Sequence, residues 1–269
     1  MNERNAAGSA PITPEILLRS DKDGLALLTL NRPRQYNALS AELLSALHGS
    51  LDAIAADESV RVVAITGAGP AFCAGHDLKQ MRGLPGEREV AALFSSCSEM
   101  MQKLIALPQP VIAAVNGLAT AAGCQLAAQC DLAVAADNAR FAVSGINLGL
   151  FCSTPAVAVS RNLSRKRAAE MLLTGEFIDA ETALDWGLVN RVCPADRLIE
   201  TVAALAATLK AKPRDSLALG KALFYRQLET GMARAYEDAS RTIAGNMMRP
   251  SAVEGVDAFL EKRSPKWES

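Results

Sequence analysis

Aromatic and histidine side chains are scarce in this sequence. Aromatic residues make up 4% of the 269 positions, which disfavours a ligand pocket built from stacked rings, and the only two histidines are His48 and His76. A metal site built from histidines within one chain is therefore disfavoured, and we expect no metal or separate cofactor. No two cysteines have the C-x2-C spacing of a zinc site, and a chain of this size does not need disulfides, so we expect reduced thiols. The cysteines are Cys73, Cys97, Cys124, Cys130, Cys152 and Cys193.

The chain also lacks a block of like charge and a long apolar run. Its 28 basic and 29 acidic residues leave a net charge of −1, so the sequence carries no electrostatic footprint for nucleic acid or an anionic membrane. No run approaches the roughly 20 apolar residues of a transmembrane helix. The opening residues, MNERNAAGSAP, lack the apolar segment of a signal peptide and make a poor transit peptide. We therefore expect a flexible stretch over 1–14 and a cytosolic protein.

Apolar runs and helical periodicity alternate through the first two thirds of the chain. Short apolar or β-branched runs predict strands within 15–30 and over 60–66, 110–117 and 131–137. Ser40 precedes a segment in which Leu43, Leu44, Leu47, Leu51 and Ile54 fall on one helical face, and a second helix is predicted over 88–106. This alternation is typical of an α/β fold with a mostly parallel sheet that helices cover on both faces.

The pattern becomes helical after residue 154. Helices are predicted over 164–174, 179–186, 196–210, 213–230 and 232–248, with VNRVC as the one further strand. We therefore divide the chain into an α/β core over 15–195 and a helical C-terminal region over 196–269.

Two loops that each follow a strand combine small residues with the start of a helix. They are GAGPAFCAGHDLK, after the strand at 60–66, and GLATAAGCQ, after the strand at 110–117. Ligands of open α/β proteins lie beyond the carboxyl ends of strands, and one amide from each loop could hold a single carbonyl oxygen. The first loop is not a dinucleotide fingerprint, because Phe72 stands where G-x-G-x-x-G needs its third glycine.

Three longer segments resemble the crotonase superfamily, the enoyl-CoA hydratases and isomerases, and within it the enoyl-CoA hydratase domain-containing proteins. The segments are AFCAGHDLKQM, PVIAAVNGLATAAGCQLAAQCDLAVAADNARF and FLEKRSPKW. The resemblance runs from about residue 15 to the end. It implies a spiral of repeated ββα units with a helical C-terminal region, an acyl-CoA thioester as substrate, and a homotrimer or a dimer of trimers.

The resemblance also implies roles for particular residues. The amides of His76 and Ala122 would hold the thioester oxygen. Phe259 would pack near coenzyme A from the C-terminal region, either of the same chain or of a neighbouring subunit. Ala74, Asp77 and Leu78 would line the adenine end of coenzyme A, while Arg32, Lys79 and Lys262 are candidates for its phosphates.

The two glutamates that act on water in hydratases of this family are both missing. By the resemblance, Gln125 stands in place of the first and Gly145 in place of the second. An amide cannot take a proton near neutral pH, so efficient two-glutamate hydration is disfavoured. An acyl-CoA enzyme leads over a non-catalytic acyl-CoA-binding protein and over a purely structural subunit. Such an enzyme has either a modest hydratase activity or a substrate whose own group supplies the proton or leaves as CO2, as in a decarboxylase.

Other polar residues near the expected acyl pocket allow two interpretations each. Ser144 either bonds the substrate or satisfies loop backbone, and the imidazole of His76 points either into the pocket or outward. Cys152 is either a nucleophile or part of a helix start at Pro155 that Ser153 or Thr154 caps, and we favour the cap. Three glutamates that border this region are expected at the solvated surface, namely Glu87, Glu89 and Glu99.

Overall fold

Two β-sheets form the centre of the molecule in a computed structural model that describes residues 15–267. The larger sheet has the order β1-β2-β3-β5-β7-β10, in which only β1 and β2 pair antiparallel. The smaller sheet has the order β4-β6-β8-β9. The expected flexible stretch over 1–14 lies outside the described residues. The strands are β1 (Leu17–Lys22), β2 (Leu25–Leu30), β3 (Val62–Gly67), β4 (Ala71–Cys73), β5 (Val111–Val115), β6 (Leu118–Thr120), β7 (Leu132–Ala136), β8 (Arg140–Ala142), β9 (Ile178–Asp179) and β10 (Arg191–Cys193).

The chain alternates between the two sheets in a spiral. Three times, a strand of the larger sheet is followed by a strand of the smaller sheet and then by helix: β3 and β4, β5 and β6, β7 and β8. This is the expected spiral of repeated ββα units. The short strands of the smaller sheet were missing from the sequence prediction, because three residues are too few to show a period.

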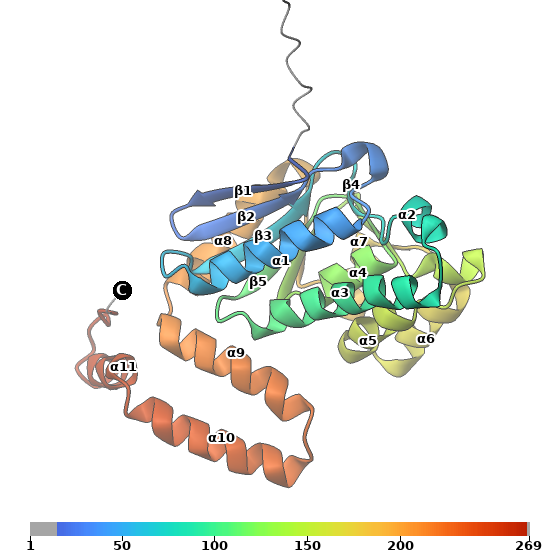
Figure 1. Cartoon of the computed structure of the whole chain (residues 1–269). Helices are drawn as coiled ribbons and strands as arrows, with labels where there is room; N and C mark the ends of the chain where they lie inside the picture. Colours follow the sequence, from blue (N-terminus) through green and yellow to red (C-terminus); the bar gives the residue numbers. More distant parts are fainter. Residues whose placement is uncertain (1–14, 268–269) are drawn as a thin grey trace, which may run out of the picture.

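Helices cover both faces of the larger sheet, as predicted (Figure 1). On one face α1 and α3 pack on the sheet, and all five predicted apolar residues of α1 are buried. On the other face α8 packs through Leu198, Val202 and Leu205, so α8 belongs to the core layers. The helices are α1 (Ala41–Ala56), α2 (Leu78–Gly83), α3 (Glu87–Ala106), α4 (Ala122–Gln129), α5 (Ser153–Asn162), α6 (Arg165–Thr174), α7 (Ala180–Trp186), α8 (Leu198–Lys210), α9 (Arg214–Leu228), α10 (Met232–Met247) and α11 (Pro250–Leu260), with 3-10 turns at Pro33–Gln35, Ser144–Leu148 and Ala195–Arg197.

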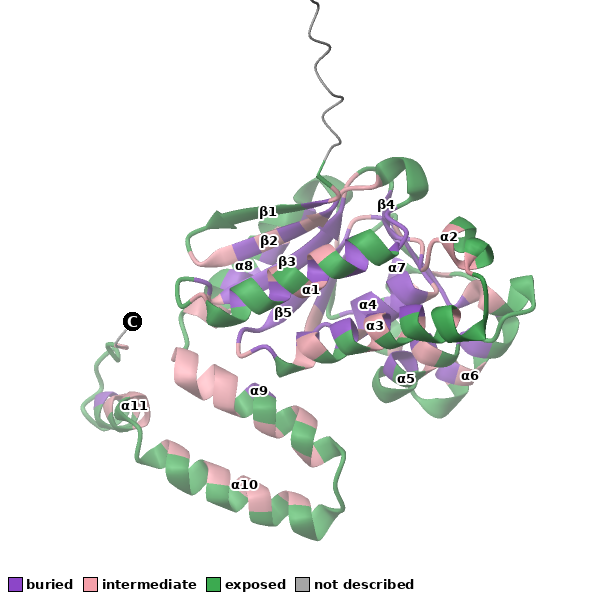
Figure 2. Cartoon of the chain, viewed as in Figure 1, coloured by how far each residue is buried: buried purple, intermediate pink, exposed green. Residues whose placement is uncertain are grey.

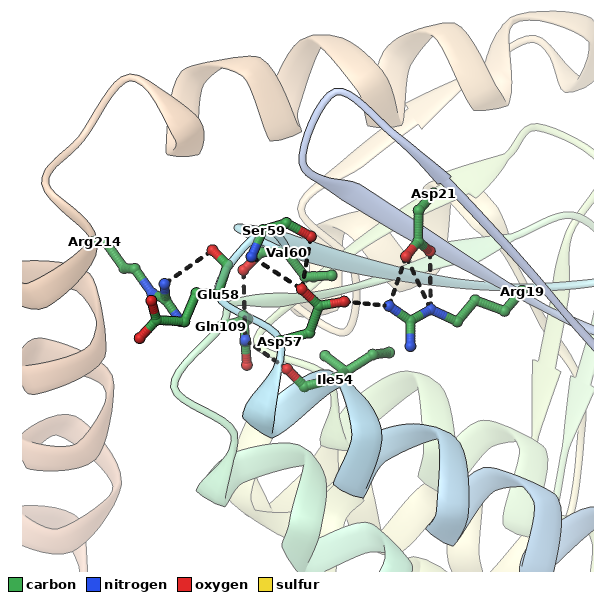
Figure 3. Close-up of polar contacts among 9 residues, drawn as sticks. All are labelled: Arg19, Asp21, Ile54, Asp57, Glu58, Ser59, Val60, Gln109 and Arg214. Atoms are coloured by element: carbon green, nitrogen blue, oxygen red, sulfur yellow. Dashed lines mark hydrogen bonds and ion pairs between the residues drawn. The ribbon is translucent and has the colours of Figure 1, made fainter. Parts of the chain in front are cut away.

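Polar contacts tie the end of α1 to three other segments (Figure 3). Arg19 of β1 forms an ion pair with Asp57, with 3.0 Å between the guanidinium and the carboxylate. The buried amide of Gln109 donates to the carbonyl of Ile54 at 2.9 Å. Arg214, the first residue of α9, donates to the carbonyl of Glu58 at 2.9 Å. The entry to β3 is thus held by groups from β1, from the segment before β5 and from α9.

The last three helices extend away from the sheets (Figure 1). Helix α10 has no buried residue and shows only intermediate and exposed positions (Figure 2). Helix α11, which the sequence pattern did not predict, leads to Trp267, whose indole N–H donates to the carbonyl of Ala211 at 3.0 Å. Among the described residues, no helix is long and apolar enough to cross a bilayer.

Candidate active site

A cavity of about 550 Å³ opens where three parallel strands of the smaller sheet end. Residues that follow β4, β6 and β8 line it, among them Ala74, Ala122 and Gly145. Because parallel strands bring their carboxyl ends to one edge of a sheet, the two loops singled out from the sequence meet there. The cavity therefore lies where the sequence predicted a ligand.

Two backbone N–H groups at the cavity have no hydrogen-bond acceptor among the described residues. The N–H of Leu39 donates to the carbonyl of Gly75 at 2.7 Å, and the N–H of Asp77 donates to the carbonyl of Leu39 at 3.1 Å. The N–H of His76, which lies between Gly75 and Asp77 in the chain, takes no part in this bridge. Ala122 is the first residue of α4, so its N–H has no acceptor one turn earlier in the helix. Both residues line the cavity.

The backbone before α4 is held in an uncommon conformation. Ala121 has φ 50° and ψ −120°, a region that side-chain-bearing residues rarely adopt. The facing Gly75 has φ +90°, and a Cβ added there would lie 2.9 Å from the methyl group of Ala121. The two loops are therefore packed so closely that Gly75 has no room for a side chain.

The imidazole of His76 points into the structure and not outward to solvent. It lines the cavity and packs edge to face on Phe94, with 4.7 Å between the ring centroids. Its Nε2 is buried and has no hydrogen-bond partner among the described residues. Burial lowers the pKa of His76 to about 4, so the ring is neutral near pH 7.

Neither position assigned to a hydratase glutamate carries a carboxylate into the cavity. Gln125 is 4% exposed, and its Oε1 has no partner within the described part of the chain. The N–H of Gly145 donates to the sulfur of Cys152 at 3.2 Å, and a Cβ on Gly145 would lie 2.7 Å both from that sulfur and from the carbonyl oxygen of Leu150. No carboxylate side chain is among the cavity-lining residues that the structure describes.

Cys152 is a buried thiol, and burial raises its pKa. A raised pKa disfavours the thiolate, so the site does not activate this cysteine as a nucleophile. The expected side-chain cap is wrong: α5 begins at Ser153, two residues before Pro155, and no side chain caps it.

Ser144 lines the cavity through a side chain that already has a partner. Its hydroxyl lies 2.8 Å from that of Thr120, which joins the ends of β6 and β8. The glutamates expected at the surface are exposed: Glu87, Glu89 and Glu99.

The residues assigned to coenzyme A fall into two groups. Ala74 and Leu78 line the cavity, and Lys79 is exposed at the start of α2. Asp77 caps α2 by accepting from the N–H groups of Lys79 and Gln80, and it forms a 2.9 Å ion pair with Arg32. That pair holds the pKa of the Asp77 carboxyl below its usual range.

Phe259 and Lys262 do not meet these residues within one chain. Phe259 is 82% exposed on α11, and α11 lies at the opposite end of the molecule from α2 (Figure 1). Neither residue lines the cavity.

The sequence reading missed the apolar walls of the cavity. One wall comes from α2 and α3 and includes Met81, Val90 and Phe94, and the other is the segment 148–151. The apolar residues of LGLF could have predicted the second wall, because clustered apolar side chains are costly to leave exposed in a loop. No group of three potential metal ligands occurs within residues 15–267.

The chain belongs to the enoyl-CoA hydratase/isomerase family, whose sequence model matches residues 20–269. The rat enoyl-CoA hydratase domain-containing protein 3, mitochondrial, is 44% identical over 94% of this chain and 85% of its own length. An enoyl-CoA hydratase structure from Mycobacterium smegmatis superposes with a TM-score of 0.93 at 56% identity, covering 95% of this chain and all of the other. The structure of human enoyl-CoA hydratase domain-containing protein 3 gives 0.90 at 42% identity, covering 94% of this chain and 100% of the other.

These comparisons confirm the predicted family and the crotonase fold with a helical C-terminal region. They contradict the predicted cytosolic location, because the rat, mouse and human relatives are all named mitochondrial. The absence of a recognisable targeting pattern in MNERNAAGSAP was therefore a poor basis for assigning a compartment.

Proposed function

We propose that this protein binds an acyl-CoA thioester and stabilises negative charge on the thioester oxygen between the N–H groups of His76 and Ala122. The observation that carries the proposal is the pair of unpartnered N–H groups at one cavity. A buried N–H without an acceptor is costly, and two such groups at one cavity favour a ligand oxygen that accepts both hydrogen bonds.

Such an arrangement supports chemistry at the carbon next to the carbonyl group. When the thioester becomes an enolate, its oxygen gains charge, and each positioned donor lowers the barrier by about 3 kcal/mol. The strained Ala121 and the close packing of Gly75 hold the donors in place before the substrate binds. Loop reorganisation would then add little to the barrier.

Efficient hydration of simple 2-enoyl-CoAs is not part of this proposal. Gln125 cannot exchange a proton, Gly145 has no side chain, and no carboxylate lines the cavity in the described residues. Each missing acid or base typically removes about 100-fold to 10,000-fold of rate. A substrate that itself supplies the proton, or that forms the enolate by losing a group, fits the site better.

We also propose that the site is completed by a neighbouring copy of the chain in a homotrimer or a dimer of trimers. Phe259, exposed on α11, and Lys262 would then reach the coenzyme A held beside Arg32 and Lys79. Several large apolar side chains of α9–α11 are exposed in the single chain, which supports an interface there. They include Phe224, Leu228, Met232, Tyr236, Ile243, Met247 and Phe259.

The test is the infrared carbonyl stretch of butanoyl-CoA carrying ¹³C at the thioester carbon. We expect binding to lower this frequency relative to water, because two N–H donors polarise the C=O bond. Ala122→Pro removes one of the two donors, at the first position of a helix, where proline is tolerated, and should reduce the shift. The matched control is Arg165→Pro, which places proline at the same position of α6.

Two results would overturn the proposal. One is a wild type that binds no acyl-CoA, and the other is a bound thioester whose carbonyl frequency equals that in water. Circular dichroism shows whether Ala122→Pro is folded, and if it is not, the wild-type frequency alone decides.

A further inference from the structure

Two apolar segments of the chain form walls of the cavity. Helices α2 and α3 form the first wall, and the second is the segment 148–151, which we call the leucine loop. At the mouth of the cavity, Leu78, Leu148, Leu150 and Phe151 are 52%, 62%, 49% and 49% exposed. Single exposed apolar side chains are ordinary, but four around one concavity mark a place where apolar surface is covered by a ligand.

The leucine loop is held in place in the free protein. The N–H of Leu150 donates to the carbonyl of Gly145 at 3.0 Å, and the N–H of Gly145 donates to the Cys152 sulfur. The amide of Asn147 donates to the carbonyl of Gly175 at 3.3 Å. The wall is therefore formed before any ligand arrives, which lowers the entropy lost on binding.

No positive side chain is among the cavity-lining residues that the structure describes. His76 is neutral near pH 7 because burial holds its pKa near 4, and the hydroxyls of Ser144 and Thr120 bond to each other. An acyl group with a carboxylate at the far end of its chain would lose the hydration of that carboxylate there and gain no counter-charge. The lining thus disfavours acyl chains with a carboxylate at the end remote from the thioester.

We propose that the cavity selects an uncharged apolar acyl chain, gripped between the leucine loop and α2–α3, and rejects chains that end in a carboxylate. This inference rests on the proposed function, because the N–H groups of His76 and Ala122, which would hold the thioester oxygen, belong to residues that line the same cavity. A cavity of about 550 Å³ is within the usual range for a small-molecule ligand. Each methylene that becomes buried lowers the Kd about fourfold.

Calorimetric titration with butanoyl-, hexanoyl- and octanoyl-CoA, and with adipoyl-CoA, tests the inference. We expect octanoyl-CoA to bind about 250-fold more tightly than butanoyl-CoA, since four further methylenes are buried. Adipoyl-CoA has the length of hexanoyl-CoA with a terminal carboxylate, and we expect it to bind at least about tenfold more weakly. Equal affinity along the series, or tighter binding of adipoyl-CoA, would overturn the inference.

Two variants at one exposed position assign the effect to the leucine loop. Leu148→Ala should reduce the increase in affinity from butanoyl- to octanoyl-CoA. Leu148→Lys should reduce the difference in affinity between hexanoyl- and adipoyl-CoA. The control is Leu173→Ala on α6, because Leu173 is similarly exposed, at 67%, and does not line the cavity.

The same titrations separate the two proposals. If butanoyl-CoA binds with a lowered carbonyl frequency but chain length has no effect, the proposed function stands and the acyl selectivity fails. If none of the thioesters binds, the proposed function itself fails.

Discussion

A buried ion pair fastens the C-terminal helices to the core, and its removal is the sharpest stability test of the structure. Lys221 of α9 is 9% exposed, and its ammonium donates to the Asp131 carboxylate at 2.6 Å. It also donates to the carbonyls of Leu104 and Gln109, at 2.8 and 2.9 Å. Burial lowers the pKa of Lys221 even though Asp131 opposes that shift. Thus α9 is joined to the end of α3, to the segment before β5 and to the start of β7.

Lys221→Met keeps most of the apolar stem and removes all three donors. Asp131 keeps two partners, the hydroxyl of Tyr225 at 2.8 Å and the N–H of Val111 at 2.6 Å, but loses its counter-charge. Breaking one side of a buried ion pair costs about 3–5 kcal/mol. For a chain of this size each kcal/mol shifts the Tm by about 2–4 °C, so we expect a loss of roughly 6–20 °C.

Thermal unfolding followed by circular dichroism measures this loss. The control is Lys166→Met, at an exposed position of α6, where a substitution changes stability by no more than about 0.5 kcal/mol. If Lys221→Met melts within about 2 °C of this control, the ion pair does not hold the C-terminal helices, and the placement of α9 in Figure 1 is refuted.

Three further predictions concern the loops of the cavity. Ala121→Gly should raise the Tm by about 2–4 °C, because glycine adopts a φ of 50° without strain. The strain energy that is relieved exceeds the free energy lost through the more flexible unfolded chain by about 1 kcal/mol, and an unchanged or lower Tm would contradict the strain. Gly145→Ala should cost about 1–3 kcal/mol in urea unfolding, because the new Cβ meets the Leu150 carbonyl; a neutral result would show that this loop moves freely. His76 is neutral in the folded protein down to about pH 4, whereas the unfolded chain takes up that proton near pH 6.5, so stability is lost as the pH falls between these values. Between pH 7 and pH 4, His76→Gln should therefore lose about 3 kcal/mol less than the wild type in urea unfolding, and equal losses would refute the burial of the ring.

Much of the fold could be predicted because its signals are local. The apolar face of α1 and the buried runs of β3, β5 and β7 follow from residues close together in the chain. Ser40, which precedes the predicted helix, is its N-cap, since its side chain accepts from the N–H of Leu43. The antiparallel pairing of β1 with β2 was missed, because the polar residues of β1 show no apolar run.

By itself, the sequence determined which chemical groups are present: small-residue loops after two strands, an amide at position 125, a glycine at 145 and a scarcity of aromatic side chains. Only the tertiary structure decided which groups meet. It brought the N–H groups of His76 and Ala122 to one cavity, buried the imidazole, and paired Asp131 with Lys221, 90 positions later. The physical reason is that periodicity and turn chemistry act over a few residues, whereas burial, pKa and the pairing of charges depend on segments that folding brings together from far along the chain.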